Sequence, residues 1–283
     1  MTDRAGTMKK IKIGKALIGG GEPFALIAGP CVIEDERQTV DIARALKGIT
    51  EELGLAFIFK ASYDKANRTS LDSYRGPGFE KGLEILKTIR DKLGVPVLSD
   101  VHRFEEIDRA SSILDVVQVP AFLCRQTDFI LEVARKAPVI NIKKGQFLAP
   151  WDVEHIIRKV VSTGNDNFLI TERGTTFGYN NLVSDFRSIA VLRALGYPVV
   201  YDATHSVQLP GGAGAASGGE REMVPALSRA AVAVGVDALF MEVHPRPDEA
   251  LCDGPNSLAL GSLPQLLRLL KAIDAIVKER MKT

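Results

Sequence analysis

The sequence Phe24-Ala-Leu-Ile-Ala28, followed at once by Gly29-Pro30-Cys31, carries the pattern that decides the fold. An apolar run without polar alternation is typical of a parallel strand that is buried on both faces. The Gly-Pro pair that follows marks the end of such a strand. Seven further runs of the same kind lie downstream: Ala56–Phe59, Val95–Leu98, Val116–Val119, Val139–Ile142, Phe168–Thr171, Val199–Tyr201 and Ala238–Met241.

Stretches with apolar residues three or four positions apart separate these runs and predict amphipathic helices. Examples are Thr39–Leu53, Phe79–Leu93, Trp151–Val161, Ser184–Leu195, Arg221–Val234 and a last helix over Leu263–Met281. Strict alternation of strand and helix predicts an α/β fold with a parallel sheet. Eight such units favour closure into a (β/α)8 TIM barrel, with an open doubly wound sheet as the alternative.

A short segment precedes the first strand and predicts an additional element. Residues 8–23 contain Lys10-Ile-Lys-Ile-Gly and then Gly19-Gly-Gly, a pattern typical of a β-hairpin, which we expect to cap the bottom of the barrel. No Pro-rich or Ser-rich linker divides the chain, so we expect one domain over residues 1–283, with the barrel at 24–260 and the last helix at 263–281.

The composition excludes several classes of protein. The 283 residues include 36 Lys plus Arg and 35 Asp plus Glu, which gives a net charge of +1 and argues against binding to nucleic acid. No apolar run approaches the roughly 20 residues that a membrane helix needs. The three cysteines cannot form a disulfide framework, and their odd number favours a reducing compartment, so we expect a cytoplasmic protein.

The strand runs lead directly into side chains that can perform chemistry. These side chains are Lys60, Asp100, His102, Gln118, Lys143, Lys144, Glu172, Arg173, Asp202, His205, Glu242 and His244. Because the active site of such a barrel is built at the carboxyl ends of its strands, we expect them to meet in one cavity. A barrel with a purely structural role does not need this pattern.

Basic residues form one group within this set: Lys60, Lys65, Arg68, Lys144 and Arg173. Cations that face one another are costly unless an anion neutralises them. Arg offers a two-pronged donor to phosphate or carboxylate, and Lys offers a point charge. The group therefore predicts that the cavity binds one or two small, highly charged anions.

A second group suits a metal ion. Cys31, His205, Glu242 and Asp253 are expected to meet where the last strands close against the first. Thiolate, imidazole and carboxylate ligands suit a divalent metal ion such as zinc, iron(II), manganese or a similar ion. A lone Cys after a strand is more often a small buried side chain, and His102 and His244 are competing ligands, so these residues alone leave the metal open.

Longer motifs carry a resemblance to a known family. They are Phe59-Lys-Ala-Ser-Tyr-Asp-Lys-Ala-Asn-Arg-Thr-Ser, Gln118-Val-Pro-Ala-Phe-Leu-Cys-Arg-Gln-Thr-Asp, Asn141-Ile-Lys-Lys-Gly-Gln-Phe, Glu172-Arg-Gly-Thr-Thr-Phe-Gly-Tyr-Asn-Asn-Leu and Asp202-Ala-Thr-His-Ser-Val-Gln. From about Ile27 to Leu260 the chain resembles the 3-deoxy-D-manno-octulosonate 8-phosphate (Kdo8P) synthase family. The resemblance implies a transferase that condenses phosphoenolpyruvate with D-arabinose 5-phosphate and water. The products are Kdo8P and phosphate, for lipopolysaccharide biosynthesis, and the enzyme is expected to be a homotetramer.

The resemblance also implies roles for individual residues. Lys65, Lys144 and Arg173 would hold phosphoenolpyruvate, and His205 and Asp253 are expected to take part in catalysis. The other predicted substrate contacts are Ser62 and Gln118 near phosphoenolpyruvate, Lys60 and Asn67 at arabinose 5-phosphate, Arg68 and Thr69 at its phosphate from a neighbouring subunit, and Arg125.

Gly29-Pro30-Cys31 resembles the metal-dependent branch of the family, whose ligands would be Cys31, His205, Glu242 and Asp253. Two rival functions stay open. The related synthase that makes 3-deoxy-D-arabino-heptulosonate 7-phosphate from erythrose 4-phosphate shares the barrel, but this chain has Lys65-Ala-Asn-Arg-Thr in place of its Lys-Pro-Arg-Thr. A non-catalytic anion-binding barrel is the more distant alternative.

Overall fold

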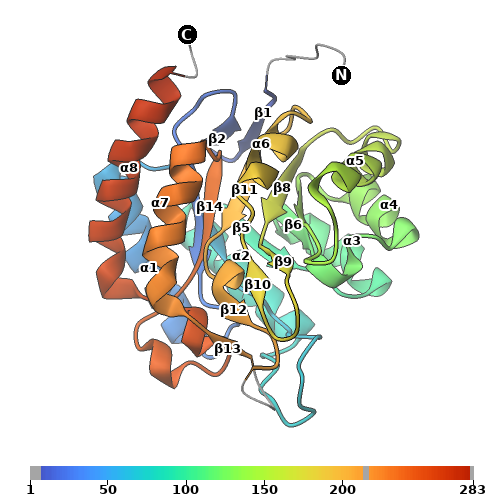
Figure 1. Cartoon of the computed structure of the whole chain (residues 1–283). Helices are drawn as coiled ribbons and strands as arrows, with labels where there is room; N and C mark the ends of the chain where they lie inside the picture. The colour runs from blue at the N-terminus through green and yellow to red at the C-terminus, as the bar shows by residue number, and fades with distance from the viewer. Residues whose placement is uncertain (1–7, 213–216, 281–283) are drawn as a thin grey trace.

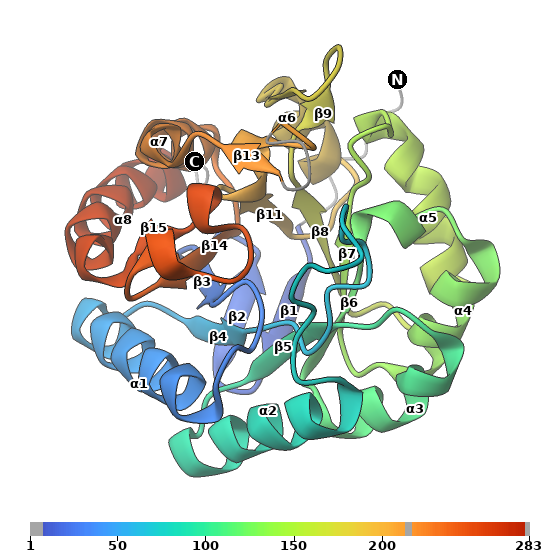
Figure 2. The same ribbon diagram turned by 90° about the horizontal axis from the view of Figure 1, so that it is seen from below.

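The computed structural model describes residues 8–212 and 217–280, and in these ranges eight parallel strands form a closed barrel (Figures 1 and 2). The barrel closes because β14 pairs in parallel with both β11 and β3, which excludes an open doubly wound sheet. The barrel strands are β3 (Ala25–Gly29), β4 (Phe57–Lys60), β5 (Val97–Asp100), β6 (Val116–Val119), β7 (Ile140–Lys143), β8 (Phe168–Glu172), β11 (Val199–Asp202) and β14 (Ala238–His244).

Eight helices cover the outside of the described barrel, as Figure 2 shows along its axis. They are α1 (Glu36–Leu53), α2 (Phe79–Leu93), α3 (Phe104–Ile113), α4 (Thr127–Lys136), α5 (Val153–Val161), α6 (Arg187–Arg193), α7 (Val224–Val234) and α8 (Leu263–Arg280). The starts predicted at Trp151 and Arg221 fall in short 3-10 turns, Pro150–Asp152 and Arg221–Met223, which precede the helices. Met281, the predicted end of the last helix, lies outside the described residues.

The strands are where the sequence predicts them, but most of them end one to three residues later. β4 includes Lys60, β11 includes Asp202, and β14 continues to His244. An apolar run stops at the first charged residue, whereas the backbone of a strand continues while its neighbour still offers hydrogen bonds. The residues expected just beyond the strands are therefore held by the sheet itself.

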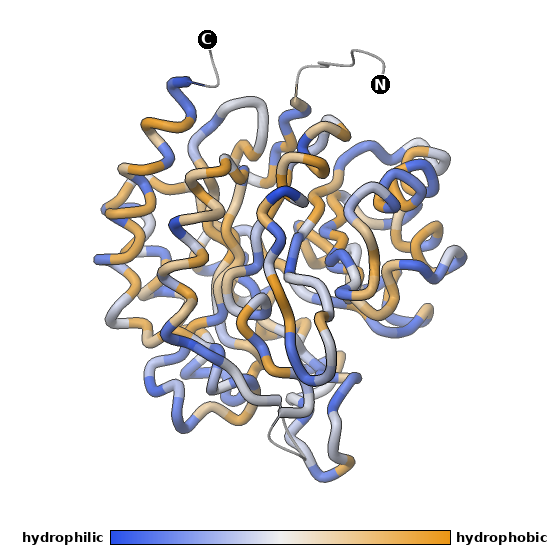
Figure 3. Tube along the Cα trace, viewed as in Figure 1, coloured by the Kyte–Doolittle hydropathy of each residue, from blue (hydrophilic) through white to orange (hydrophobic). Residues whose placement is uncertain are grey.

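Each barrel strand divides its side chains between two cores. In β3, Leu26 and Ala28 face the helices, and Ala25 and Ile27 face the barrel interior. This alternation follows from the period of two in a strand. Figure 3 shows apolar colour along the barrel strands and a mixture of apolar and polar colour along the helices around them.

The predicted N-terminal hairpin is confirmed and closes the bottom of the barrel, which is the end where the parallel strands begin and lies at the top of Figure 1. β1 (Lys10–Ile13) pairs with β2 (Ala16–Gly19), and the turn between them begins at Gly14, which adopts a left-handed conformation. Ile11, Ile13 and Ile18 are buried with the inward residues of the barrel, where they seal its lower end. A functional cavity can consequently open only at the other end.

Short elements surround this other end. β9 (Thr175–Thr176) pairs with β10 (Leu182–Val183), β12 (Gln208–Leu209) pairs with β13 (Gly218–Gly219), and β15 (Leu258–Ala259) pairs in parallel with the end of β14. A Cβ atom on Gly29 would lie 1.9 Å from the carbonyl oxygen of Lys60, so only glycine allows β3 and β4 to approach where Cys31 follows.

Within the described ranges, no helix is long and apolar enough to span a membrane.

Candidate active site

The last inward-facing positions of the strands form a ring of polar side chains at the mouth of the barrel. Because alternate residues point inward, the same pattern that buries Ile58 and Val200 below directs polar residues into the mouth above them. The ring consists of Lys60, Asp100, Gln118, Lys143, Asp202 and Glu242, all of them buried. The site is therefore an extension of the core packing and is held by rigid strands.

A cavity of about 380 Å³ opens above this ring. Nine of the residues that the sequence predicts to bind substrate or metal line it: Lys60, Lys65, Asn67, Arg68, Thr69, Gln118, Arg173, His205 and Asp253. They come from five different strands or the loops that follow them. Arg68 and Thr69 line the cavity of their own chain, whereas the resemblance implied that they reach in from a neighbouring subunit. Their individual roles stay predictions.

Other predicted residues lie behind the cavity wall or away from it. Ser62 is buried and donates a hydrogen bond to Asp100 Oδ1 at 2.5 Å. Cys31 and Glu242 are also buried, immediately below the cavity lining. Arg125 is exposed and is not among the described residues that line the cavity, so nothing in the geometry supports its predicted contact with substrate.

The neighbouring residues Lys143 and Lys144 point to opposite sides of the wall. Lys143 lines the cavity, and its Nζ lies 2.5 Å from Asp202 Oδ2. Lys144 is completely buried behind β7, where its Nζ donates to the Leu148 carbonyl at 3.1 Å and lies 3.5 Å from Glu172 Oε1. The place at the cavity that the sequence analysis assigned to Lys144 is occupied by Lys143.

The sequence contained the signal for this assignment. Asn141 and Lys143 are two positions apart in β7, and Asn141 Nδ2 donates to Gln118 Oε1 inside the barrel at 3.0 Å. By the period of two, Lys143 must share that face and Lys144 must not. The sequence also predicts Asp100 and His102 at the mouth, without a substrate contact, and both line the cavity. Gln146 and Gln208, which were given no role, line it as well.

Arg173 is fixed by amide side chains from two loops. Its Nη1 donates to Gln146 Oε1 at 3.1 Å and its Nη2 donates to Gln208 Oε1 at 3.0 Å. Burial lowers the pKa of Arg173, and Asp202 opposes this effect. The guanidinium is thus oriented toward the cavity by neutral partners, which leaves its charge available to an anion.

Carboxylates lie among the cations of the cavity. Lys60 Nζ donates to Glu242 Oε1 at 3.0 Å, and Lys65 Nζ lies 3.8 Å from the same oxygen. Burial alone would raise the pKa of Glu242, but the charges of His205, Lys60 and Lys65 hold this pKa well below its usual value. The cations are therefore partly compensated within the protein, which the sequence analysis did not anticipate.

Asp202 organises the opposite side of the ring. Its Oδ2 lies 2.8 Å from His205 Nδ1, and its Oδ1 accepts a hydrogen bond from the His205 backbone at 2.9 Å. In the neutral form of the ring, which a metal ion binds, a carboxylate at Nδ1 holds the proton there, and Nε2 carries the lone pair. Burial would raise the pKa of Asp202, but His205 and Lys143 outweigh it and hold this pKa well below its usual range.

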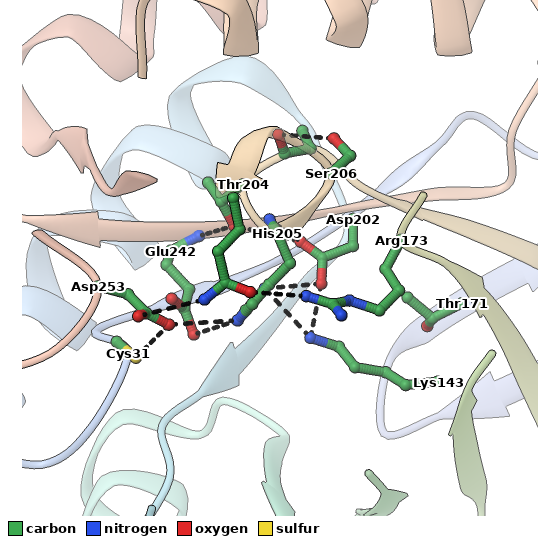
Figure 4. A network of polar contacts seen from close by, with 12 residues as sticks. Cys31, Lys143, Thr171, Arg173, Asp202, Thr204, His205, Ser206, Glu242 and Asp253 are labelled. Atoms are coloured by element: carbon green, nitrogen blue, oxygen red, sulfur yellow. Dashed lines mark hydrogen bonds and ion pairs between the residues drawn. The ribbon is translucent and has the colours of Figure 1, made fainter. Parts of the chain in front are cut away.

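The four predicted metal ligands meet at Asp253, which belongs to two groups of potential ligands in the described chain: one with His205 and Glu242, and one with Cys31 and Cys252 (Figure 4). His205 Nε2 lies 3.6 Å from Glu242 Oε1 and 3.7 Å from Asp253 Oδ2, and Cys31 Sγ lies 3.5 Å from Asp253 Oδ2. Ligand atoms on a tetrahedral ion with bonds of about 2.0–2.3 Å are separated by roughly 3.3–3.8 Å. Glu242 Oε2 is buried with no hydrogen-bond partner among the described residues. The chemistry of His205, Glu242 and Asp253 therefore fits a divalent metal ion, and Cys31 adjoins this group through Asp253.

Burial raises the pKa of the Cys31 thiol well above its usual value. The sulfur of the metal-free protein is therefore a thiol, and a metal ion must displace its proton in order to bind.

The two competing histidines are engaged elsewhere. His102 Nε2 lies 3.2 Å from Asp100 Oδ2, and this carboxylate raises the pKa of His102 against the lowering effect of burial. His244 Nε2 lies 2.9 Å from Gln38 Nε2, and its Nδ1 lies 2.7 Å from the Arg246 carbonyl. Both form hydrogen bonds around the site, and neither belongs to a group of potential ligands in the described chain.

We predict that Asp202→Asn destabilises the protein by about 3–5 kcal/mol at pH 7, because Lys143 and His205 would lose a buried partner. Since the pKa of Asp202 is lowered on folding, its stabilising effect is complete above an unfolded pKa of about 3.9 and is lost as the pH falls through the folded pKa. Urea unfolding of both proteins is measured at pH 7, 5, 4 and 3. As the pH falls from 5 to 3, the unfolding free energy should decrease less in Asp202→Asn than in wild type.

The matched control is Asp41→Asn, an exposed carboxylate paired with Arg44 on α1. It should leave the pH dependence of unfolding unchanged. Equal pH dependence in wild type and Asp202→Asn would contradict the role assigned to Asp202.

Comparison with known proteins agrees with this geometry. Residues 7–279 match the model of the DAHP synthetase I family. A 2-dehydro-3-deoxyphosphooctonate aldolase of Geotalea uraniireducens is 62% identical over 271 residues, 96% of this chain and 100% of that protein. Proteins of the same name from Geobacter sulfurreducens and Syntrophotalea carbinolica are each 60% identical, over 95% of this chain and 99% and 97% of theirs. The chain therefore belongs to the DAHP synthetase I family, with 2-dehydro-3-deoxyphosphooctonate aldolases as its close relatives.

Proposed function

We propose that this protein is a Kdo8P synthase, the enzyme that its relatives' name describes. It condenses phosphoenolpyruvate with D-arabinose 5-phosphate and water to give Kdo8P and phosphate, a step of lipopolysaccharide biosynthesis. The observation that carries the proposal is identity of about 60% with the named relatives over nearly the whole chain. The cavity supports it, because cations reach it from two separate directions.

These directions suit two phosphorylated substrates. Lys143 and Arg173 project from the β7 and β8 side, and Asn67, Arg68 and Thr69 belong to the loop between β4 and α2. The first set is placed to hold phosphoenolpyruvate deep in the cavity, and the second to hold the sugar phosphate at its rim. Holding both molecules side by side makes the condensation effectively intramolecular.

The chain's own residues would then stabilise charge along the reaction. C3 of phosphoenolpyruvate attacks the aldehyde carbon, water adds at C2, and phosphate leaves by cleavage of its C–O bond. Negative charge develops on oxygen atoms in these steps, and fixed cations in a site that excludes water stabilise it. Lys65, Lys143 and Arg173 lie at the cavity to do so.

We further propose that Cys31, His205, Glu242 and Asp253 hold a divalent metal ion. The support is that Asp253 Oδ2 lies near both His205 Nε2 and Cys31 Sγ, and that Glu242 Oε2 has no hydrogen-bond partner among the described residues. When bound, such an ion supplies Lewis acidity toward the aldehyde or activates a water molecule. Asp202 orients the imidazole for it.

A homotetramer is the proposed assembly. Aromatic side chains on the loops after β7 and β8 are exposed, including Trp151, Phe177 and Tyr179, and these loops contact each other through Thr176 N and the Gln146 carbonyl. Exposed apolar patches mark interaction surfaces. Contacts between subunits would cover these rings.

The substrate assignment predicts a preference between two sugars. Purified protein given phosphoenolpyruvate should release phosphate at least tenfold faster with arabinose 5-phosphate than with erythrose 4-phosphate, measured in a coupled phosphate assay. Faster turnover with erythrose 4-phosphate would favour the heptulosonate synthase. Binding of phosphoenolpyruvate in calorimetry without turnover, with metal supplied, would favour the non-catalytic barrel.

The metal assignment predicts loss of activity on chelation. Protein dialysed against a chelator should lose at least nine-tenths of its rate and recover it when zinc, iron(II) or manganese is added. Cys31→Ala should in addition retain less than one-tenth of the wild-type metal content, measured by elemental analysis, because one of four ligands is removed. Full activity in both the chelated protein and Cys31→Ala would contradict the proposed site.

Neighbouring lysines offer a further test. Lys143→Met should lower kcat/KM of the folded protein by about 10²–10³, because it removes a donor from the cavity. It should also lower stability, because Asp202 loses one of its buried partners. Lys144→Met should leave Glu172 without its buried cation and cost about 3–5 kcal/mol of stability, with a much smaller effect on kcat/KM in the folded protein. Steady-state kinetics and thermal melting of both variants would separate the two effects. The reverse pattern would restore Lys144 to the active site.

A further inference from the structure

Cys31, a proposed metal ligand, lies next to a second cysteine, Cys252. The Cys31 thiol donates to Cys252 Sγ at 3.2 Å, although the residues are 221 positions apart. Both side chains are buried, at 4% and 3% exposure. A disulfide needs a sulfur–sulfur distance of about 2.05 Å, so the two atoms are about 1 Å from bonding distance.

The surroundings of the two sulfurs differ. Cys252 lines the cavity, and Arg68 Nη1 donates to its Sγ at 2.7 Å. Cys31 lies behind it, between Cys252 and Asp253. The third cysteine, Cys124, is buried in the core between helices and barrel, and it belongs to a different cluster. Only one pair of the three cysteines is therefore placed to react.

We propose that Cys31 and Cys252 form an oxidisable dithiol, whose disulfide takes the Cys31 sulfur away from metal binding. The formation of the disulfide rests on the geometry of the two sulfurs alone. Its effect on metal rests on the metal site in the proposed function. The pair makes this active site sensitive to peroxide.

The chemistry requires a peroxide as oxidant. A small peroxide enters through the cavity, where it meets Cys252 first. The Cys252 sulfur attacks one oxygen of hydrogen peroxide and becomes a sulfenic acid, with release of one water molecule. The Cys31 sulfur then attacks Cys252 Sγ, a sulfur–sulfur bond forms, and the hydroxyl leaves as a second water with the thiol proton. Two thiols are oxidised and one peroxide is reduced to two water molecules.

The disulfide would disturb two proposed ligands together. Cys31 can no longer become the thiolate that binds a metal ion, because its S–H bond is replaced by the S–S bond. Asp253 follows Cys252 directly in the chain. Asp253 adopts a left-handed conformation with φ of 49°, and its carbonyl accepts hydrogen bonds from the backbone of Asn256 and Ser257. This tight turn transmits a shift of Cys252 to the neighbouring carboxylate, because the backbone has little freedom to absorb it.

The first experiment maps the bond in wild-type protein. Metal-free full-length protein is treated with equimolar hydrogen peroxide, its remaining thiols are alkylated, and a non-reducing digest is analysed by mass spectrometry. We expect one linked peptide pair that contains Cys31 and Cys252, alkylated Cys124, and reversal by dithiothreitol. Separate sulfinic acids on Cys31 and Cys252, or both thiols still reduced, would overturn the proposal.

Matched variants keep the experiment specific. Cys252→Ser should yield no linked peptide, whereas Cys124→Ala, at a position outside the site, should yield the same link as wild type. A linked peptide that contains Cys124 in wild type would overturn the assignment. Circular dichroism of each variant confirms that it is folded before oxidation.

A second experiment measures zinc. Reduced protein should bind one equivalent, oxidised protein less than one-tenth of this amount, and zinc loaded beforehand should slow formation of the link at least tenfold. Undiminished zinc binding by oxidised protein would overturn the effect on metal. If reduced protein binds no zinc while the linked peptide still forms, the proposed metal site fails and the dithiol stands.

Discussion

The buried carboxylate of Glu242 is the group on which the rest of the site depends. It has no exposed surface, and it lies at the centre of Lys60, Lys65 and His205. An isolated carboxylate in such a place would cost many kcal/mol, so its ionised form requires the cations around it. The cations in turn are tolerable inside the barrel because Glu242 compensates them. Each group is positioned by the strand that carries it, and neither could be buried alone.

Because carboxylates and cations compensate one another in the cavity, its positive residues alone do not explain how it would bind an anion. A cavity of uncompensated cations would attract any anion, whereas here Glu242, Asp202 and Asp100 already balance Lys60, Lys143 and His102. A phosphorylated substrate must therefore offer contacts better than those the carboxylates provide. Arg173 is the cation best placed for this, because its partners Gln146 and Gln208 are neutral. Geometry, more than total charge, should decide which anion is bound.

The sequence was sufficient for the fold and for much of the site, and the exceptions have physical causes. The eight apolar runs located every barrel strand, and the polar residues after them located the mouth. Sequence reasoning placed Lys144 in the cavity on the strength of a family motif. In a strand, however, side chains alternate between the two faces, and this alternation directs Lys143 inward. The contact between Cys31 and Cys252 could not be predicted from the sequence, since it depends on how the loop after β14 folds back over β3.

Barrel closure and assembly of the site are one event. β14 pairs with β3 so that Glu242 lies opposite Gly29, two residues before Cys31, and it pairs with β11 so that Phe240 lies opposite Asp202, three residues before His205. The three strands that close the barrel thus deliver three of the four proposed ligands. An open sheet would carry the same residues and separate them. Any ion bound there would bridge the first and last strands of the barrel, and its binding free energy would add directly to the stability of the closed form.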